Sequence, residues 1–231
     1  MMKLKIKAGL TLLLGLVMMN TMSAHAGVAL GATRVIFPAD QKQVQLAVNS
    51  NDEKGSFLIQ SWVENPEGKK DGRFVITPPL FLMQGKKENT LRIIDATNNQ
   101  LPKDRESLFW INVKAIPSLD KSKMNSNVLQ LAITSRIKLL YRPAGLNIAP
   151  DQAAAQLRFH RQGDTLKLIN PTPYFLTVTQ LNAGTRVLEN SMVPPMGNAE
   201  VKILPGSGAD ITYQTINDFG ALTPKMKGVM Q

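Results

Sequence analysis

Short runs of alternating apolar and polar residues recur along the chain, and helical periodicity is scarce. Alternation with a period of two is typical of β-strands that have one buried face. Turn-forming stretches rich in Asn, Asp, Gly and Pro separate the runs. In the first half, the expected strands cover residues 28–37, 43–49, 56–64, 73–77, 90–94, 108–116 and 127–141. Seven strands over roughly 115 residues predict an immunoglobulin-like sandwich.

A second set of expected strands follows a segment of different composition. Residues 142–150 (RPAGLNIAP) are rich in Pro and Gly and show little apolar periodicity, which indicates a hinge. The strands expected beyond it cover residues 156–161, 165–170, 174–183, 186–189, 199–203 and 210–216. We therefore predict an all-β chain, with an N-terminal immunoglobulin-like domain over residues 27–145 and a smaller C-terminal β-sandwich domain over residues 146–231.

The strand expected at residues 127–141 is unusual in both length and pattern. Leu129, Leu131 and Ile133 alternate with smaller or more polar residues and so share one face. Strands usually have about five or six residues, and a long apolar edge strand is an aggregation hazard unless it pairs with another chain. Two interpretations stay open: the three side chains fill a partner's groove, or they belong to the protein's own core. The polar residues 118–126 before them are expected to form a mobile connection.

The first 26 residues have the pattern of a secretory signal peptide. Lys3, Lys5 and Lys7 precede an apolar run over residues 8–19, and Ala24-His25-Ala26 supplies a cleavage site of small residues. The apolar run is too short to span a bilayer, which needs about 20 residues. We expect export with cleavage after Ala26; an uncleaved membrane anchor is the alternative.

Composition narrows the possible functions of the remaining chain. Removing three of the 27 basic residues with the signal leaves 27 − 3 = 24, against 17 acidic residues, a net charge of +7. Neither a basic-aromatic motif nor a helix-turn-helix pattern accompanies this charge, so nucleic acid is not an expected partner. Cysteine is absent from the sequence, which excludes disulfides and thiolate metal sites.

Catalytic patterns are also missing from the sequence. His160 is the only histidine beyond the signal, and we expect it on an exposed strand surface. The sequence shows neither a G-x-S-x-G motif nor a phosphate-binding loop. We therefore predict a non-covalent function, without enzymatic activity, cofactor or metal.

Four segments carry a resemblance to a known family. Residues 101–117 (LPKDRESLFWINVKAIP) resemble the signature of the periplasmic pilus-assembly chaperones, a two-domain immunoglobulin-like family. The segments GVALGATRVIFP (27–38), INPTPYFLT (169–177) and TINDFGALTP (215–224) also look like family segments. The resemblance spans essentially the whole exported chain, and the residues of these segments are most similar to those of the type 1 fimbrial branch of the family.

The resemblance implies a fold and a function. The fold would be two immunoglobulin-like sandwiches joined by a short hinge in an L or boomerang shape. The function would be to bind and fold fimbrial pilin subunits and the tip adhesin by donating an edge strand. Such a chaperone prevents premature assembly and delivers its subunits to an outer-membrane usher, without stable insertion into the membrane.

The resemblance also implies functional residues. Arg34 and Lys138 match the family's pair of cations that anchor the subunit's C-terminal carboxylate, and the donated side chains would be Leu129, Leu131 and Ile133. Charged family positions that form an interdomain network are matched by Glu106, Arg142 and Asp218. The alternative for that network is three unrelated surface charges. Trp110 and Asn112 are expected to be core and strand-satisfying residues.

Two other functions compete with this interpretation. A structural fimbrial subunit or adhesin would have an incomplete first sandwich, whereas the seventh strand is present here and a second domain follows. An exported enzyme on a sandwich scaffold would need catalytic groups, and the chain is poor in His and Cys.

The signal-peptide pattern makes a direct prediction. We expect the exported protein to begin at Gly27, because the small residues Ala24 and Ala26 satisfy the requirement of the cleavage site. N-terminal sequencing of the protein from a periplasmic extract checks this. A membrane-bound product that begins at Met1 would contradict it.

Overall fold

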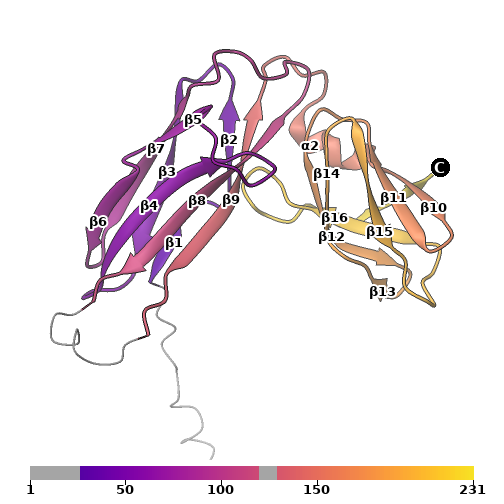
Figure 1. The fold of residues 1–231 in the computed structure, drawn as a ribbon. Helices are drawn as coiled ribbons and strands as arrows, with labels where there is room; N and C mark the ends of the chain where they lie inside the picture. The colour runs from indigo at the N-terminus through magenta and orange to yellow at the C-terminus, as the bar shows by residue number, and fades with distance from the viewer. Residues whose placement is uncertain (1–26, 120–128) are drawn as a thin grey trace, which may run out of the picture.

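Two β-sandwiches meet at an angle in the computed structural model, which describes residues 27–119 and 129–231 (Figure 1). The predicted all-β architecture of two sandwiches is confirmed, and the angle between them gives the molecule a boomerang outline (Figure 1). The expected signal peptide and most of the expected connection at residues 118–126 lie outside the described residues.

The first domain packs a four-stranded sheet against a five-stranded sheet. In sheet order, the four-stranded sheet contains β1 (Val28–Leu30), β3 (Gln43–Ser50), β7 (Glu88–Asp95) and β5 (Phe74–Thr77). The five-stranded sheet contains β2 (Arg34–Pro38), β9 (Ile133–Arg142), β8 (Ser107–Pro117), β4 (Ser56–Glu64) and β6 (Leu80–Gln84).

The strand expected at residues 28–37 is in fact two strands in different sheets, so that prediction was wrong. β1 pairs antiparallel with β3, whereas β2 pairs parallel with β9. The chain crosses between the sheets just after Gly31, whose N–H donates to the Ala47 carbonyl at 2.8 Å. A Cβ on Gly31 would lie 2.9 Å from the Cβ of Ala47, so glycine permits this close approach. β6 was not predicted, because Pro78 and Pro79 interrupt the apolar pattern before it.

The long strand expected at residues 127–141 is shorter than predicted. β9 begins at Ile133, which pairs with Ala115 near the end of β8. Residues 129–132 have no ladder partner in the described part of the chain and are not strand. A β-strand requires hydrogen bonds to a neighbouring strand, and residues 129–132 have no such neighbour among the described residues. Their alternating pattern was therefore not sufficient to make them part of β9.

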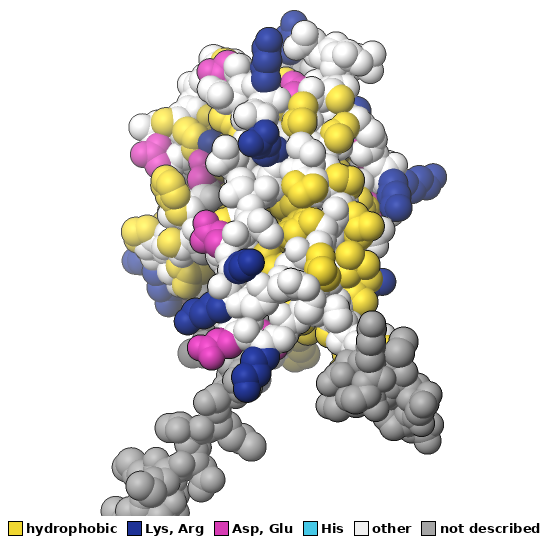
Figure 2. All heavy atoms as spheres, turned by 90° about the vertical axis from the view of Figure 1, so that its left-hand side faces the viewer, with side chains coloured by type: hydrophobic (Ala, Val, Ile, Leu, Met, Phe, Trp, Pro, Cys, Tyr) yellow, Lys and Arg dark blue, Asp and Glu magenta, His cyan; other side chains and the backbone are white. Residues whose placement is uncertain are grey.

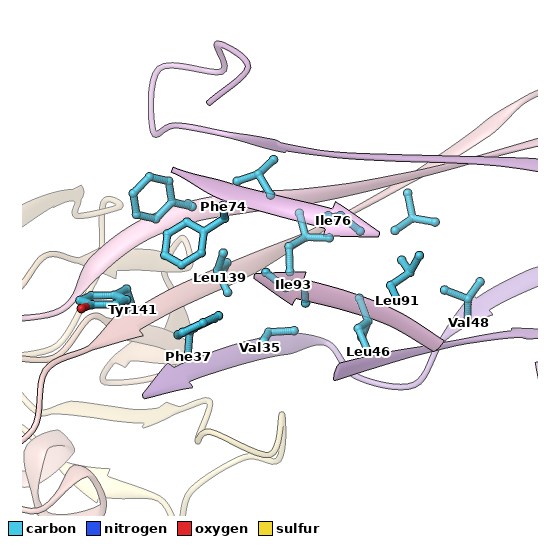
Figure 3. Close-up of a cluster of buried hydrophobic side chains, with 14 of the residues drawn as sticks. Val35, Phe37, Leu46, Val48, Phe74, Ile76, Leu91, Ile93, Leu139 and Tyr141 are labelled. Atoms are coloured by element: carbon cyan, nitrogen blue, oxygen red, sulfur yellow. The ribbon is translucent and has the colours of Figure 1, made fainter. Parts of the chain in front are cut away.

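Buried side chains from both sheets fill the core of the first domain (Figure 3). Along β2, Val35 and Phe37 point into this core, and Phe37 lies 5.1 Å from the Phe74 ring, centroid to centroid. Burying each such side chain contributes about 1.5–3 kcal/mol to folding. The inward direction of Val35 and Phe37 sends Arg34 to the opposite face of the sheet, which is the face that carries Lys138 and Arg142.

The second domain is a smaller sandwich. One sheet has the order β15 (Gly197–Lys202), β11 (Thr165–Asn170), β10 (Arg158–Gln162) and β18 (Val229–Met230). The other has the order β13 (Arg186–Val187), β12 (Leu176–Ala183), β16 (Ile211–Thr215) and β17 (Met226–Lys227), with β14 (Ser191–Val193) paired to β12. The short helix α2 (Pro150–Ala153) leads into this domain, followed by the 3₁₀ turn η2 (Ala154–Gln156).

Several short elements of the second domain were not predicted. β14, β17, β18 and α2 have only two to four residues each, too few to show a period in the sequence. The strand expected at residues 186–189 pairs only over Arg186–Val187. The expected segment 156–161 starts in a 3₁₀ turn at Gln156.

Each sandwich has its own hydrophobic core. The first cluster draws on residues between Val28 and Tyr141, and the second on residues between Leu146 and Met226. Leu146 and Ile148, from the segment expected to be the hinge, pack against the second cluster. Over the described ranges 27–119 and 129–231, no helix is long and apolar enough to cross a membrane.

Candidate functional site

The five-stranded sheet of the first domain has a vacant strand position beside β9. β8 pairs with β9 from Ile133 to Tyr141, along all but the last residue of β9. On the other side, β2 pairs only from Arg34, opposite Lys138, to Pro38, opposite Arg142. Over residues 133–137 that side of β9 has no neighbouring strand within the described residues. Its backbone N–H and C=O groups can therefore pair with a strand from another chain.

The apolar face of β9 runs out of the core toward this vacant position. Leu139 is fully buried, Ile137 is half-buried, and Ile133, on the same face, is 67% exposed. Leu131 is 67% exposed and Leu129 is 82% exposed. The interpretation that Leu129, Leu131 and Ile133 fill the protein's own core is therefore wrong.

Arg34 and Lys138 are register partners where β2 begins to pair with β9. The Lys138 Nζ donates to Thr177 Oγ1 at 2.6 Å, and the Arg34 guanidinium donates to the Ile216 carbonyl at 3.0 Å. Both acceptors belong to the second domain, so the two cations lie where the domains meet. Among the described residues, no carboxylate forms an ion pair with either cation.

Burial makes these two cations electrostatically strained. Desolvation, and secondly the charge of Arg34, lower the pKa of Lys138 to about 8. Desolvation also lowers the pKa of Arg34, although the charges of Asp218 and Glu106 partly offset this. The buried Nε of Arg34 has no hydrogen-bond partner in the described structure. An anion between Arg34 and Lys138 would relieve both effects, and Arg and Lys are suited to bind a carboxylate.

Glu106, Arg142 and Asp218 come together into one network across the two domains. The Arg142 Nε donates to Glu106 Oε1 at 2.8 Å, and its two terminal nitrogens donate to the Asp218 carboxylate at 2.7 and 2.8 Å. The other Glu106 oxygen accepts the N–H of Phe175 at 2.8 Å, and the Arg142 guanidinium lies over the Tyr174 ring. The alternative of three unrelated surface charges is excluded by this geometry.

The network is more buried than an ordinary surface ion pair. The Glu106 side chain is fully buried, and burial raises the pKa of its carboxyl while the Arg142 charge lowers it. Burial alone would lower the pKa of Arg142, but the hydrogen bonds and charges of Asp218 and Glu106 outweigh it and raise the pKa above its usual range. Removing one member would leave a buried charge without its partner.

Three other predicted positions have different outcomes. His160 lies exposed on β10, as expected. Asn112 is buried, and its amide nitrogen has no partner in the described part of the chain. Trp110 is not in the core: it lies half-buried on the outer face of the sheet, 4.6 Å below the Arg136 guanidinium. The apolar character of Trp110 was misleading, because the Arg136 side chain can cover an aromatic face from outside.

A cavity of about 290 Å³ lies between the two domains beside Arg34. Sequence reasoning did not single out the second-domain residues that line it, including Ile216 and Phe219, nor Thr177, which binds Lys138. Their only sequence signal was their place in the segments 169–177 and 215–224, because no pattern along one domain indicates which residues face the other domain.

A separate group of exposed apolar side chains lies at the opposite edge of the five-stranded sheet. Leu82 on β6 pairs with Leu58 on β4, and Leu80 on β6 lies two residues before Leu82. Leu80 and Leu82 are both 54% exposed. Figure 2 shows hydrophobic side chains gathered on the right-hand half of this side of the first domain. In the sheet, β8 lies between this surface and β9, the strand that carries Lys138.

Two immunoglobulin-like sandwiches, a vacant strand position with exposed apolar side chains and a pair of cations between the domains define a class of protein: one that binds a polypeptide strand of a partner. Comparison with known proteins identifies the family. Residues 27–147 match the family model for the pili and flagellar-assembly chaperone, PapD N-terminal domain. Residues 152–227 match the model for the pili assembly chaperone PapD, C-terminal domain. The chain belongs to this family, and it is a chaperone and not an enzyme.

Individual relatives agree with this assignment. The chaperone protein FimC of Escherichia coli strain K12 is 70% identical over 220 residues, which are 95% of this chain and 91% of FimC. The crystal structure of the periplasmic chaperone SfaE has a TM-score of 0.78 at 65% identity, covering 89% of this chain and 100% of SfaE. The chaperone SafB, solved in complex with the Salmonella enterica SafA pilin, has a TM-score of 0.80 at 32% identity, covering 88% of this chain and 96% of the matched chain.

The buried interdomain network predicts a large effect of one substitution. Arg142→Ala should destabilise the protein by about 3–5 kcal/mol, because the fully buried Glu106 carboxylate would lose its cation. Urea unfolding followed by circular dichroism measures this change.

Arg105→Ala is the matched control for Arg142→Ala. Arg105 pairs with Asp104 next to Glu106 in the chain, but this pair is exposed to solvent. We expect the Arg105 variant to unfold like the wild type, because water screens exposed pairs. Equal unfolding midpoints for Arg142→Ala and wild type would contradict the proposed energetic importance of the network.

Proposed function

We propose that this chaperone captures a fimbrial pilin by letting the final strand of the pilin fill the vacant position beside β9. The observation that carries the proposal is that β2 stops pairing with β9 at Arg34 and Lys138. Within the described residues, five residues of β9 beyond that point have a free backbone edge, and two cations stand where an added strand would meet β2. Adding a strand to an exposed sheet edge is a general mode of peptide recognition, and chaperone–pilin complexes use it.

The position of the cations fixes the direction of the added strand. The main-chain carboxylate ends the pilin, and β2 already occupies the position beside residues 138–142, so a C-terminus bound at Arg34 and Lys138 requires the rest of the strand to extend back along residues 137 to 133 of β9. The added strand then runs parallel to β9, in line with β2. The anchor also sets the register, because a shift by one residue would turn every side chain of the added strand to the other face.

Leu129, Leu131 and Ile133 would enter the hydrophobic groove of the bound pilin. Each is at least 67% exposed in this structure, and full burial of each would contribute about 1.5–3 kcal/mol to binding. Leu131 and Ile133 also line a cavity of about 230 Å³ with Val28 and Phe57, at the end of the sandwich. Apolar groups of the pilin could therefore contact both the exposed side chains of Leu131 and Ile133 and the apolar cavity behind them.

The network of Glu106, Arg142 and Asp218 would hold the angle between the domains. It ties the turn before β8 and the end of β9 to the second domain. A fixed angle keeps Thr177 and Ile216 against the two cations, and so keeps the anchor assembled before a subunit arrives. Such preorganisation reduces the entropy cost of binding.

Delivery of a bound subunit, including a tip adhesin, to an outer-membrane usher needs a surface that the subunit leaves free. Leu58, Leu80 and Leu82 lie on the edge of the sheet opposite to β2 and β9. This exposed apolar surface suits a partner that approaches while the cleft is occupied. Delivery to an outer-membrane usher requires the chaperone to work in the periplasm, after the signal peptide has been removed behind Ala26.

A charge in the donated segment tests the strand proposal. Leu131→Glu should weaken binding of a purified type 1 pilin by at least about a hundredfold, because a carboxylate would enter an apolar groove unpaired. Isothermal titration or a pull-down from a periplasmic extract measures the loss.

The free Leu131→Glu chaperone should keep the wild-type melting temperature, because Leu131 is exposed. Leu139→Glu is the control on the same face of β9, and there we expect unfolding, since Leu139 is fully buried. Unfolding of the Leu131 variant itself would place that side chain in the chaperone's core and overturn the proposal.

The carboxylate anchor makes a second prediction. Lys138→Ala or Arg34→Ala should each reduce affinity for the pilin at least about tenfold, because charge-assisted hydrogen bonds contribute about 1.5–3 kcal/mol each. The double variant should cost little more than one of them, since both cations act on one carboxylate. A pilin with an amidated C-terminus is the decisive comparison: equal affinity of the wild type for amidated and free-acid pilin would rule the anchor out.

The pKa of Lys138 gives the anchor a pH profile. In the free chaperone Lys138 is protonated below its pKa of about 8 and loses its proton above it. A bound carboxylate favours the charged form, so binding above pH 8 requires proton uptake and affinity falls as the pH rises. Lys138→Ala should abolish this decrease, whereas the amidated pilin should show none in the wild type.

A further inference from the structure

The aromatic ring of Phe219 projects into solvent from a turn in the second domain. Its side chain is 94% exposed, more than any other large hydrophobic residue in the described ranges. Single exposed apolar residues are common on protein surfaces and need no explanation by themselves. The turn that carries Phe219 is the informative feature, because its hydrogen bonds hold the backbone of Phe219 in one place.

The side chain of Asn217 organises this turn. Its Oδ1 accepts the N–H of Phe219 at 3.1 Å and the N–H of Ala221 at 2.9 Å. The backbone N–H of Asn217 donates to the Ala221 carbonyl at 2.9 Å, and the N–H of Gly220 donates to the Asn217 carbonyl at 3.0 Å. A side chain on such an ordered turn loses less freedom on binding than one on a flexible loop.

The same turn is attached to the first domain beside the anchor. Asp218 binds Arg142, and the Ile216 carbonyl accepts a hydrogen bond from Arg34. Gly220, with a φ of +84°, packs so closely on Thr33 that a Cβ there would lie 2.2 Å from the Thr33 hydroxyl oxygen. The residues before and after Phe219 in the chain thus contact the first domain, and these contacts set the position of the Phe219 backbone relative to Arg34.

Phe219 and Arg34 line the same cavity of about 290 Å³. Its other walls include the apolar side chains of Leu140, Phe175 and Leu176. A chain end that binds Arg34 through its carboxylate thus has an apolar space next to it, with an aromatic ring at the side. Arg34 can bind the terminal carboxylate, and the apolar cavity beside Arg34 can accept an apolar side chain near that carboxylate.

We propose that Phe219 is a specificity-determining contact for the pilin, packing against an apolar side chain next to the pilin's C-terminal carboxylate. This inference rests on the proposed function, because it takes the carboxylate at Arg34 and Lys138 as given. Rigid, exposed aromatic residues are frequent among the few contacts that dominate binding energy. The occupant is the pilin and not another partner, since the ring lines the same cavity as Arg34, one of the two anchor cations.

The test compares variants of Phe219 in binding to a purified type 1 pilin. Phe219→Ala should weaken binding at least about tenfold, and Phe219→Tyr, which keeps the ring, should bind like the wild type. Leu204→Ala is the matched control, because Leu204 is 44% exposed in the same domain but does not line the cavity. All variants should keep the wild-type melting temperature.

Two further measurements separate this inference from the anchor itself. A pilin with aspartate in place of its last apolar residue should bind Phe219→Ala and wild type with equal affinity. If Phe219→Ala binds unmodified pilin as tightly as the wild type while Lys138→Ala does not, the role of Phe219 is overturned and the anchor stands. If Lys138→Ala also binds like the wild type, the anchor fails, and the inference about Phe219 fails with it.

Discussion

The parallel pairing of β2 with β9 begins at Arg34 and Lys138, and the other features of the site depend on where it begins. Had β2 extended further back along β9, the sheet would have had no vacant position. The chain instead leaves the other sheet after β1, crosses at Gly31 and joins β9 only from residue 138 onward. Five residues of β9 are thereby left with a free edge that continues directly into the two cations.

This arrangement has an energetic cost that the rest of the structure offsets. The exposed side chains of Leu129, Leu131 and Ile133 contribute no burial energy to folding, and two partly buried cations without a carboxylate partner among the described residues destabilise the free protein. Proteins retain such features where function requires them, and perturbed pKa values concentrate at functional sites. The burial of the aromatic core of the first domain supplies compensating stability.

The contact between the domains unites these elements. Acceptors from the second domain bind Arg34 and Lys138, and Asp218 binds Arg142 from the same turn that presents Phe219. One turn in the second domain thus contacts the first domain through Asp218 and forms one wall of the cavity. A strand-binding edge alone would recognise many extended chains, because backbone hydrogen bonds carry little sequence information. A cavity closed by two domains allows selection at the end of the bound chain.

The sequence by itself determined the all-β class, the two sandwiches and the family, because period-two alternation, turn residues and the segment at 101–117 are local features. Residue types at matched positions also indicated Arg34, Lys138, Glu106, Arg142 and Asp218. Tertiary structure alone decided that the first expected strand divides between two sheets, that β9 begins only at Ile133, and that Trp110 lies outside the core. It also decided which second-domain residues meet the cations. These outcomes depend on which strand supplies each hydrogen-bond partner and on how two domains pack, and such long-range contacts leave no periodic signal along the chain.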